Sequence, residues 1–124
     1  MFGKYINFLE TNMDLTSLKR NTISDNIANY NTPNYKATKV DESSMFDETL
    51  NGVLKTTKEK HIATNSMVNQ PNLYKDEETK EREDGNNVDL TVEMMDMIQT
   101  QGTYNKAIQA FNYEMGLIKK SLGQ

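Results

Sequence analysis

The chain has 124 residues, a formal net charge of −4 and a pI near 5.0, so we expect at most one domain. It contains no basic block with interleaved aromatic residues, which argues against nucleic-acid binding, and no cysteine, which excludes disulfides and thiolate metal sites. Leu, Ile, Val and Phe together number 25, about a fifth of the chain, so one copy is not expected to build a thick hydrophobic core.

The first ten residues do not resemble a secretory signal, because they carry a single lysine, an early glutamate and no continuous apolar run. No stretch of the sequence approaches the roughly 20 apolar residues that span a bilayer. We therefore expect no transmembrane segment, and we expect that a chain leaving the cytoplasm does so without a cleaved signal peptide.

An apolar pattern with alternating steps of three and four residues predicts a first helix from about Lys4 to Tyr30. Its period of 3.5 residues is typical of a coiled-coil seam. Thr16 and Arg20 interrupt the stripe near its middle. The full stripe is Phe2, Ile6, Leu9, Met13, Thr16, Arg20, Ile23, Ile27 and Tyr30, and its candidate assembly residues are Ile6, Leu9, Met13, Ile23 and Ile27.

The stretch from Asn26 to Ala37 stops this helix with turn chemistry. Pro33 offers no backbone N–H, and the residue before a proline is biased away from helical backbone. Asparagine tolerates left-handed backbone and bonds neighbouring backbone groups. We expect the segment to fix the direction in which the chain leaves the helix, and its candidate site residues are Asn26, Asn29, Asn31, Pro33, Asn34 and Tyr35.

Residues 38–88 are expected to form a loop-rich, partly disordered middle segment. The apolar spots in it are short, and two charge runs, at 55–60 and 75–84, are interpreted as solvated or mobile stretches. The pattern only weakly indicates short strands around Val53 and Val68. A turn is predicted where Asp84 and Gly85 precede two asparagines, immediately before the second periodic segment.

The second periodic segment predicts a helix from about Leu90 to Leu122, with Asp89 as its N-cap and Gly123 as a C-cap candidate. The stripe keeps the same 3.5-residue rhythm, and Gln101 is its polar member. Gly102 inside the helix costs about 1 kcal/mol relative to alanine. The candidate assembly residues here are Leu90, Met94, Met97, Tyr104, Ile108, Phe111, Met115, Ile118 and Leu122.

The predicted fold is therefore mainly α, with long N- and C-terminal helices (residues 1–37 with the turn, and 89–124) pairing as a coiled coil. Two seams of equal period favour mutual packing, either within one molecule or between copies. The methionines of the second helix are open to two interpretations, as gap-filling core or as an adaptable assembly surface.

No constellation of residues points to an enzyme. The one histidine, His61, has no second histidine at helical spacing, so no zinc site is expected. Ser24 and Ser66 lack an identifiable base, and the carboxylates lack the spacing of a calcium loop. We expect no catalytic residue, no cofactor and no metal.

Three segments resemble the bacterial flagellar rod and hook axial proteins. The first is Asn26–Ala37, which resembles the Asn-Asn-Ile-Ala-Asn-x-x-Thr-Pro-Gly-Tyr-Lys-Ala segment of that family and departs from it at Asp25 and Asn34. The second comprises residues 54–57 with His61 and Ile62. The third, from Asp84 to Met94, is similar to the opening of the C-terminal helix in proximal rod subunits.

The resemblance implies a structural subunit of the flagellar basal-body rod. Members of this family leave the cytoplasm through the flagellar export apparatus and polymerise through paired terminal helices into the shaft that transmits motor torque. The implied location is the rod in the cell envelope, and the implied assembly is homo- and hetero-oligomeric. The implied partners are other rod subunits, the rod–MS-ring junction protein and the MS ring. The alternative is a soluble helical chaperone or adaptor that binds one partner through its C-terminal helix.

Overall fold

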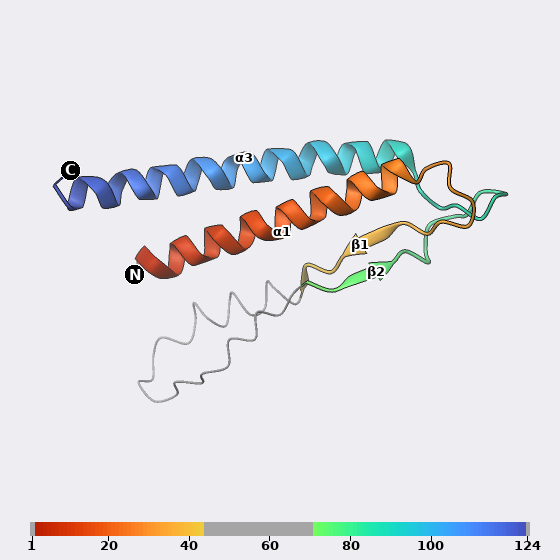
Figure 1. The fold of residues 1–124 in the computed structure, drawn as a ribbon, viewed down its shortest axis with the longest axis horizontal. Helices are drawn as coiled ribbons and strands as arrows, with labels where there is room; N and C mark the ends of the chain where they lie inside the picture. Colours follow the sequence, from red (N-terminus) through yellow and green to blue (C-terminus); the bar gives the residue numbers. More distant parts are fainter. Residues whose placement is uncertain (1, 44–70, 124) are drawn as a thin grey trace, which may run out of the picture.

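The computed structural model describes residues 2–43 and 71–123 and consists mainly of two long antiparallel helices (Figure 1). Helix α1 spans Phe2–Ala28, and helix α3 spans Leu90–Ser121. A ribbon of two short strands lies along α1. The two ends of the chain lie at the same end of the helix pair, and the connections to the ribbon meet at the other. The prediction of a mainly helical protein with two long helices is confirmed.

Helix α1 ends where the asparagine-rich segment begins. After Ala28 the helical pattern tightens into a turn, because the N–H of Tyr30 donates to the carbonyl of Ile27 at 3.2 Å and the N–H of Thr32 donates to that of Asn29 at 3.0 Å. These shorter-range bonds satisfy carbonyls that a helix end would otherwise leave open. The helix is therefore placed close to the predicted range of residues 4–30, and shifted by two residues.

The predicted N-cap of the second helix, Asp89, is present in α3, whereas the C-cap is Leu122, one residue before the predicted Gly123. The Asp89 side chain accepts the N–H groups of Thr91 and Val92 at 3.0 and 3.2 Å, which satisfies two donors of the first turn. At the other end, Leu122 is the capping residue and Gly123 follows with a φ of 76°, the left-handed conformation that glycine adopts without a Cβ penalty.

The ribbon was not predicted from the sequence. Strand β1 (Thr38–Val40) pairs antiparallel with β2 (Leu73–Lys75), with Lys39 opposite Tyr74. Three residues per strand carry too short a pattern for period-two alternation to stand out. Within the middle segment, the weakly indicated strands at Val53 and Val68, and His61, lie outside the described residues.

The two helices pack through a narrow contact row with a seven-residue repeat. Its members are Leu9, Thr16 and Ile23 on α1, and Glu93, Thr100 and Ala107 on α3, all of them buried. The threonine hydroxyl of Thr16 is satisfied on its own helix, because it donates to the carbonyl of Asn12 at 2.5 Å. Small and polar residues in the row let the two helix backbones approach each other, but they bury little apolar surface.

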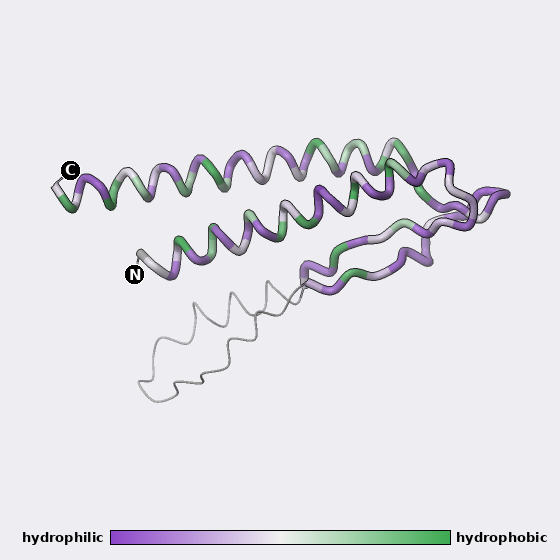
Figure 2. Tube along the Cα trace, viewed as in Figure 1, coloured by the Kyte–Doolittle hydropathy of each residue, from purple (hydrophilic) through white to green (hydrophobic). Residues whose placement is uncertain are grey.

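The apolar core of the described residues is correspondingly small. Its buried hydrophobic side chains are Leu9, Ile23, Ala37, Val88 and Ala107. Figure 2 shows hydrophobic residues recurring between hydrophilic ones along both helices, and a mainly hydrophilic end where the connections meet. None of the helices in residues 2–43 and 71–123 is long and apolar enough to cross a membrane.

Candidate functional site

The two segments with turn chemistry lie against each other at one end of the helix pair. We call this arrangement the turn lock; it comprises residues 26–37 and 84–89. Backbone bonds join the two segments, because the N–H of Asn34 donates to the carbonyl of Asp84 at 2.8 Å and the N–H of Asn87 donates to that of Tyr35 at 3.3 Å. Segments 50 residues apart in sequence thus fix one end of both helices.

Asn86 is the buried centre of the turn lock, with 0% of its surface exposed. Its side-chain amide donates to the carbonyls of Asn29 and Thr32, both at 2.8 Å, and its Oδ1 accepts the N–H of Val88 at 2.8 Å. The carbonyls belong to the turn after α1, where helical partners are missing. One side chain from the second segment therefore completes the C-terminal end of the first helix.

Asn87 connects the turn lock to the ribbon. Its Oδ1 accepts the N–H of Ala37 at 2.7 Å, and its Nδ2 donates to the carbonyl of Asp76 at 2.5 Å. The N–H of Asp76 in turn donates to the carbonyl of Ala37 at 2.8 Å, which extends the β1–β2 ladder by one bond. Asn87 is 2% exposed, so these bonds are protected from competition by water.

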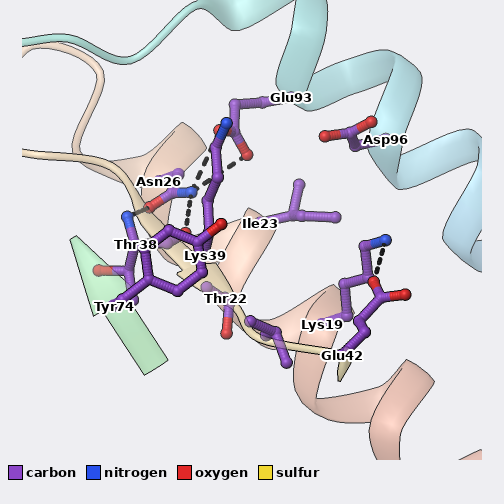
Figure 3. Close-up of a pocket in the computed structure, with 11 residues that line it drawn as sticks. Lys19, Thr22, Ile23, Asn26, Thr38, Lys39, Glu42, Tyr74, Glu93 and Asp96 are labelled. Carbon is purple, nitrogen blue, oxygen red and sulfur yellow. Dashed lines mark hydrogen bonds and ion pairs between the residues drawn. The ribbon is translucent and has the colours of Figure 1, made fainter. Parts of the chain in front are cut away.

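Asn26 joins helix α1 to both β1 and α3 (Figure 3). Its Oδ1 accepts the N–H of Thr38 at 2.9 Å and the hydroxyl of Tyr35 at 3.1 Å. Its Nδ2 donates to the carbonyl of Thr38 at 2.8 Å and to the carboxylate of Glu93, with both oxygens at 3.2 Å. This amide uses its full donor and acceptor capacity, which accounts for its burial in a protein with so small a core.

Glu93 is a carboxylate held inside the helix contact, with 4% of its surface exposed. Burial raises the pKa of Glu93 above its ordinary value, and the negative charge of Asp96 acts in the same direction. The hydrogen bond from Asn26 and the positive charge of Lys39 oppose this rise. A small cavity of about 130 Å³ beside Glu93 is lined by α1, α3 and ribbon residues.

Asp76 anchors the chain that leaves β2. Its carboxylate accepts the hydroxyl of Thr79 at 2.6 Å and the N–H of Glu78 at 2.9 Å, and it pairs with Lys39 at 2.9 Å. The Thr79 hydroxyl and Lys39 hold the pKa of Asp76 well below its usual range, although burial opposes this. The interpretation of residues 75–84 as a solvated or mobile run is therefore wrong at Asp76, because a fixed set of partners stabilises this charge.

Two residues of the turn lock adopt left-handed backbone and touch each other. Asn34 has a φ of 57° and Gly85 a φ of 79°. A Cβ added to Gly85 would lie 2.5 Å from Oδ1 of Asn34, so the two segments approach closely at this point. The expectation that Asn34 occupies a position usually filled by glycine is consistent with this geometry.

The other predicted turn residues play unequal parts in this geometry. The Asn29 side chain stays local, donating to the carbonyl of Asp25 at 2.8 Å and accepting the hydroxyl of Thr32 at 3.0 Å. Asn31 and Pro33 are exposed. Tyr30 lies under the guanidinium of Arg82, which is 4.2 Å from its ring centroid, and its carbonyl accepts a hydrogen bond from that guanidinium.

The predicted seam residues divide into two groups. Leu9 and Ile23 belong to the buried contact row. The others form rows beside the contact row, one on each helix. Arg20 connects the two rows, because it donates to Oε1 of Gln101 at 3.4 Å and its guanidinium lies 5.4 Å from the ring centroid of Tyr104. We call these rows the seam face: Ile6, Met13, Arg20 and Ile27 on α1, and Leu90, Met94, Met97, Gln101, Tyr104, Ile108, Phe111, Met115, Ile118 and Leu122 on α3.

Most of the seam face is half-buried, while Met94 and Leu122 are 53% and 71% exposed. The opposite side of the helix contact is polar and lies toward the ribbon, where Lys19 pairs with Glu42 at 2.6 Å. The apolar residues that suggested two facing seams thus lie side by side on one surface of the helix pair.

Sequence reasoning missed four residues that organise this site: Asp76, Asn86, Asn87 and Glu93. Asn86 and Asn87 had a signal, since they belong to the predicted turn and to the third resembling segment. Glu93 lies within the third resembling segment, but its heptad row with a threonine and an alanine carries no apolar signal. Asp76 was hidden in a charge run.

The described residues hold no group of three or more His, Cys, Asp or Glu side chains that could bind a metal ion. The turn lock has a structural role instead, because its side-chain amides and carboxylates are hydrogen-bonded to backbone groups and to each other. Such a network makes the junction rigid and directional without offering an exposed reactive group.

Comparison with known proteins gives a consistent result. A family described as "Flagella basal body rod protein" matches residues 6–36. The flagellar basal body rod protein FlgB of Borreliella burgdorferi is 30% identical, over 84% of this chain and 84% of that protein. FlgB of Bacillus subtilis is 29% identical over 98% of this chain and 95% of that protein, and FlgB of Aeromonas hydrophila is 28% identical over 99% and 96%.

Proposed function

Because the chain belongs to the FlgB family of flagellar basal body rod proteins, we propose that it polymerises through its terminal helices into the shaft that transmits motor torque. Members of the family are structural proteins of the basal body, and the chain is accordingly a structural rod protein and not an enzyme. The family assignment also favours this function over the helical adaptor considered from the sequence.

The observation that carries the proposal is the half-exposed seam face. A long apolar surface of this kind is unusual on a monomer and typical of a protein–protein interface. The seam face runs along α3, whose 32 residues extend for roughly 48 Å at 1.5 Å per residue. Covering it with helices of neighbouring subunits would bury the apolar side chains that one copy leaves partly exposed.

The turn lock supports the same function in a different way. It fixes the angle between α1, α3 and the ribbon with bonds that are largely buried, so a load on one helix is passed to the other through a stiff junction. We propose that residues 1–37 and 89–124 form the assembly domain and that residues 38–88 form a loop-rich middle segment, whose described parts pack against α1 and complete the turn lock. The proposed partners are other rod subunits, the rod–MS-ring junction protein and the MS ring.

Export is the other part of the proposal. We propose that the chain is handled by the flagellar export apparatus, without a cleaved signal peptide, and reaches the rod in the periplasmic part of the cell envelope. A small core suits this route, because a chain that is only marginally stable before assembly can unfold for export at little cost.

The test is an in-frame deletion of the gene, scored for swimming and for basal bodies by electron microscopy. We expect loss of swimming with assembly halted before the rod, and recovery when the wild-type gene is restored. Complete rods in swimming cells that lack the gene would rule the proposed function out.

A further inference from the structure

Arg20 is the one charged residue of the seam face, and it lies about midway along it. The other members of the face are apolar or aromatic, apart from Gln101. Arg20 is half-buried, with its guanidinium over the ring of Tyr104. A charged group in the middle of an apolar contact surface strongly affects which partners can bind there.

The hydrogen-bonding capacity of Arg20 is mostly unused within the part of the chain that the structure describes. A guanidinium has five N–H donors, and here one of them reaches Gln101 at a long distance of 3.4 Å. The ion pairs among these residues involve Lys19, Lys36, Lys39 and Arg82, and none involves Arg20. A partner that covered the face without an acceptor would leave the charge desolvated and uncompensated.

We propose that the seam face binds a helix of a neighbouring subunit whose own apolar stripe carries a carboxylate opposite Arg20, and that Arg20 prevents the face from pairing with a second copy of itself. The inference rests on the proposed rod function and specifies the partner's chemistry. Arginine matches a carboxylate with two parallel N–H bonds, so this pairing is directional as well as favourable.

Symmetry explains the second half of the proposal. A two-fold dimer uses the same surface on both subunits, so pairing two seam faces about their centre brings the two Arg20 side chains toward each other. Like charges in a partly desolvated contact are repelled, which disfavours the closed dimer. A face that does not pair with an identical face but binds a different surface avoids a closed dimer. Assembly can then continue beyond two subunits.

The Arg20→Glu variant of the same chain is the probe, because it presents the same apolar stripe with a carboxylate in place of the guanidinium. We expect an equimolar mixture of wild-type protein and Arg20→Glu to form a 1:1 complex, and each protein alone to remain monomeric up to at least about tenfold higher concentration. Analytical ultracentrifugation measures the masses, and circular dichroism at the same concentrations shows that each variant is folded and whether helix is gained in the mixture.

Lys19→Glu is the matched control, because it reverses the neighbouring charge on the ribbon side of α1, where Lys19 pairs with Glu42. Mixing this variant with wild type is expected to give no complex. Arg20→Leu, which makes the face uniformly apolar, is expected to self-associate. A monomeric Arg20→Glu mixture, a mixture with Lys19→Glu that associates equally, or an Arg20→Leu variant as monomeric as wild type would each overturn the proposal. These measurements involve no cells, so such a failure leaves the deletion test of rod function independent.

Discussion

The side-chain amide of Asn86 holds together both segments of the turn lock. It is fully buried, and it satisfies two carbonyls at the end of α1 and one N–H of its own segment. A hydrophobic side chain at this position would fill the space but leave the N–H of Val88 without its acceptor and remove one donor from each carbonyl. The turn lock is therefore held together by side-chain hydrogen bonds and not mainly by the packing of apolar side chains.

We predict that Asn86→Ala lowers the free energy of unfolding by about 2–4 kcal/mol, because the buried N–H of Val88 loses its acceptor and the carbonyls of Asn29 and Thr32 each lose a donor. Asn31→Ala, in the same turn lock but exposed, is the control and should change it by less than about 0.5 kcal/mol. Urea unfolding followed by circular dichroism measures both. If the two variants unfolded at the same urea concentration, Asn86 would not be a main source of the stability of the turn lock.

Glycine replacements are expected to have opposite effects in the turn lock and in α3. Gly85→Ala should destabilise by about 1–2 kcal/mol, because alanine is strained at a φ of 79° and its Cβ would crowd Asn34. Gly102→Ala should stabilise by about 1 kcal/mol, because an added Cβ there meets nothing within 4 Å and alanine favours helix. Thermal melts of the two proteins measure both effects, and a shift of the same sign in each would refute the argument.

The carboxylates of Glu93 and Asp76 predict opposite dependences on pH. Burial raises the pKa of Glu93, so the folded chain binds this proton more tightly, and its contribution is fully present below the ordinary pKa of 4.5 and lost as pH rises through the folded value. The pKa of Asp76 is lowered by its partners, so its contribution is present above the ordinary value of 3.8 and lost as pH falls.

Melting temperatures across pH test these signs. Glu93→Gln, which keeps an acceptor for Asn26 but carries no charge, should melt above wild type at pH 7, and the gap should close as pH falls below 4.5. Asp76→Asn should melt below wild type at pH 7 and converge with it at low pH. A Glu93→Gln advantage that is constant with pH would mean that charge is not its cause.

At the scale of the elements, the helices have one surface that holds the pair together and another that remains available. The contact row is narrow and buries Glu93, Thr100 and Ala107 on α3, whereas the more apolar rows are turned aside. In an isolated helical hairpin the most apolar stripe would normally face the partner helix. In this protein α3 is rotated about its axis so that its most apolar stripe does not face α1. This orientation suits a helix pair whose apolar stripe is covered by another subunit.

We predict that Ile108→Asp blocks rod assembly while leaving export intact, because it places a carboxylate in the half-buried seam face. Gln109→Asp, one residue further on an exposed surface, is the control and should support swimming. Motility in soft agar, together with detection of the protein outside the cytoplasm, separates the two steps. Swimming by the Ile108→Asp strain would remove the seam face from the assembly proposal.

The sequence predicted the elements more completely than it predicted their contacts. The N-cap Asp89 and the start of α3 were predicted correctly, and Gly123 marked the C-terminal end to within a residue or two, because both residues act through neighbouring backbone alone. Pairings across the chain had no such local signal. The row of Glu93, Thr100 and Ala107 was invisible because burial there depends on the position of α1, and the ribbon was missed because three-residue strands are too short to show a pattern.

On the scale of the whole molecule, the small apolar core implies a chain of low stability by itself. Five buried hydrophobic side chains, two of them alanines, make up that core in the described residues. A two-helix pair with so little buried apolar surface has little to offset the conformational entropy of ordering. Neighbours that cover the seam face would supply the missing burial.

We therefore predict that the purified chain gains helix when it is mixed with a subunit that covers its seam face, and that raising its own concentration has little effect, because Arg20 disfavours pairing of two identical faces. Circular dichroism at 222 nm over a range from low to high micromolar concentration compares the wild-type chain alone with an equimolar mixture of wild type and Arg20→Glu. The same mixture made with Ile108→Asp in place of wild type should show no gain. Equal helix signals for the chain alone and for the mixture would show that the chain does not depend on neighbours.

The nesting of contacts around the ribbon has a consequence for the order in which the chain folds. Pairing of Val40 with Leu73 closes the innermost loop, after which Asn34 and Asp84 need little further closure, and the helices follow outward from Asn26 and Glu93. Because each step lengthens the loop only slightly, its added entropic cost is small. The pair should close like a zipper toward the termini, with amide exchange slowest beside the ribbon and progressively faster toward the two chain ends.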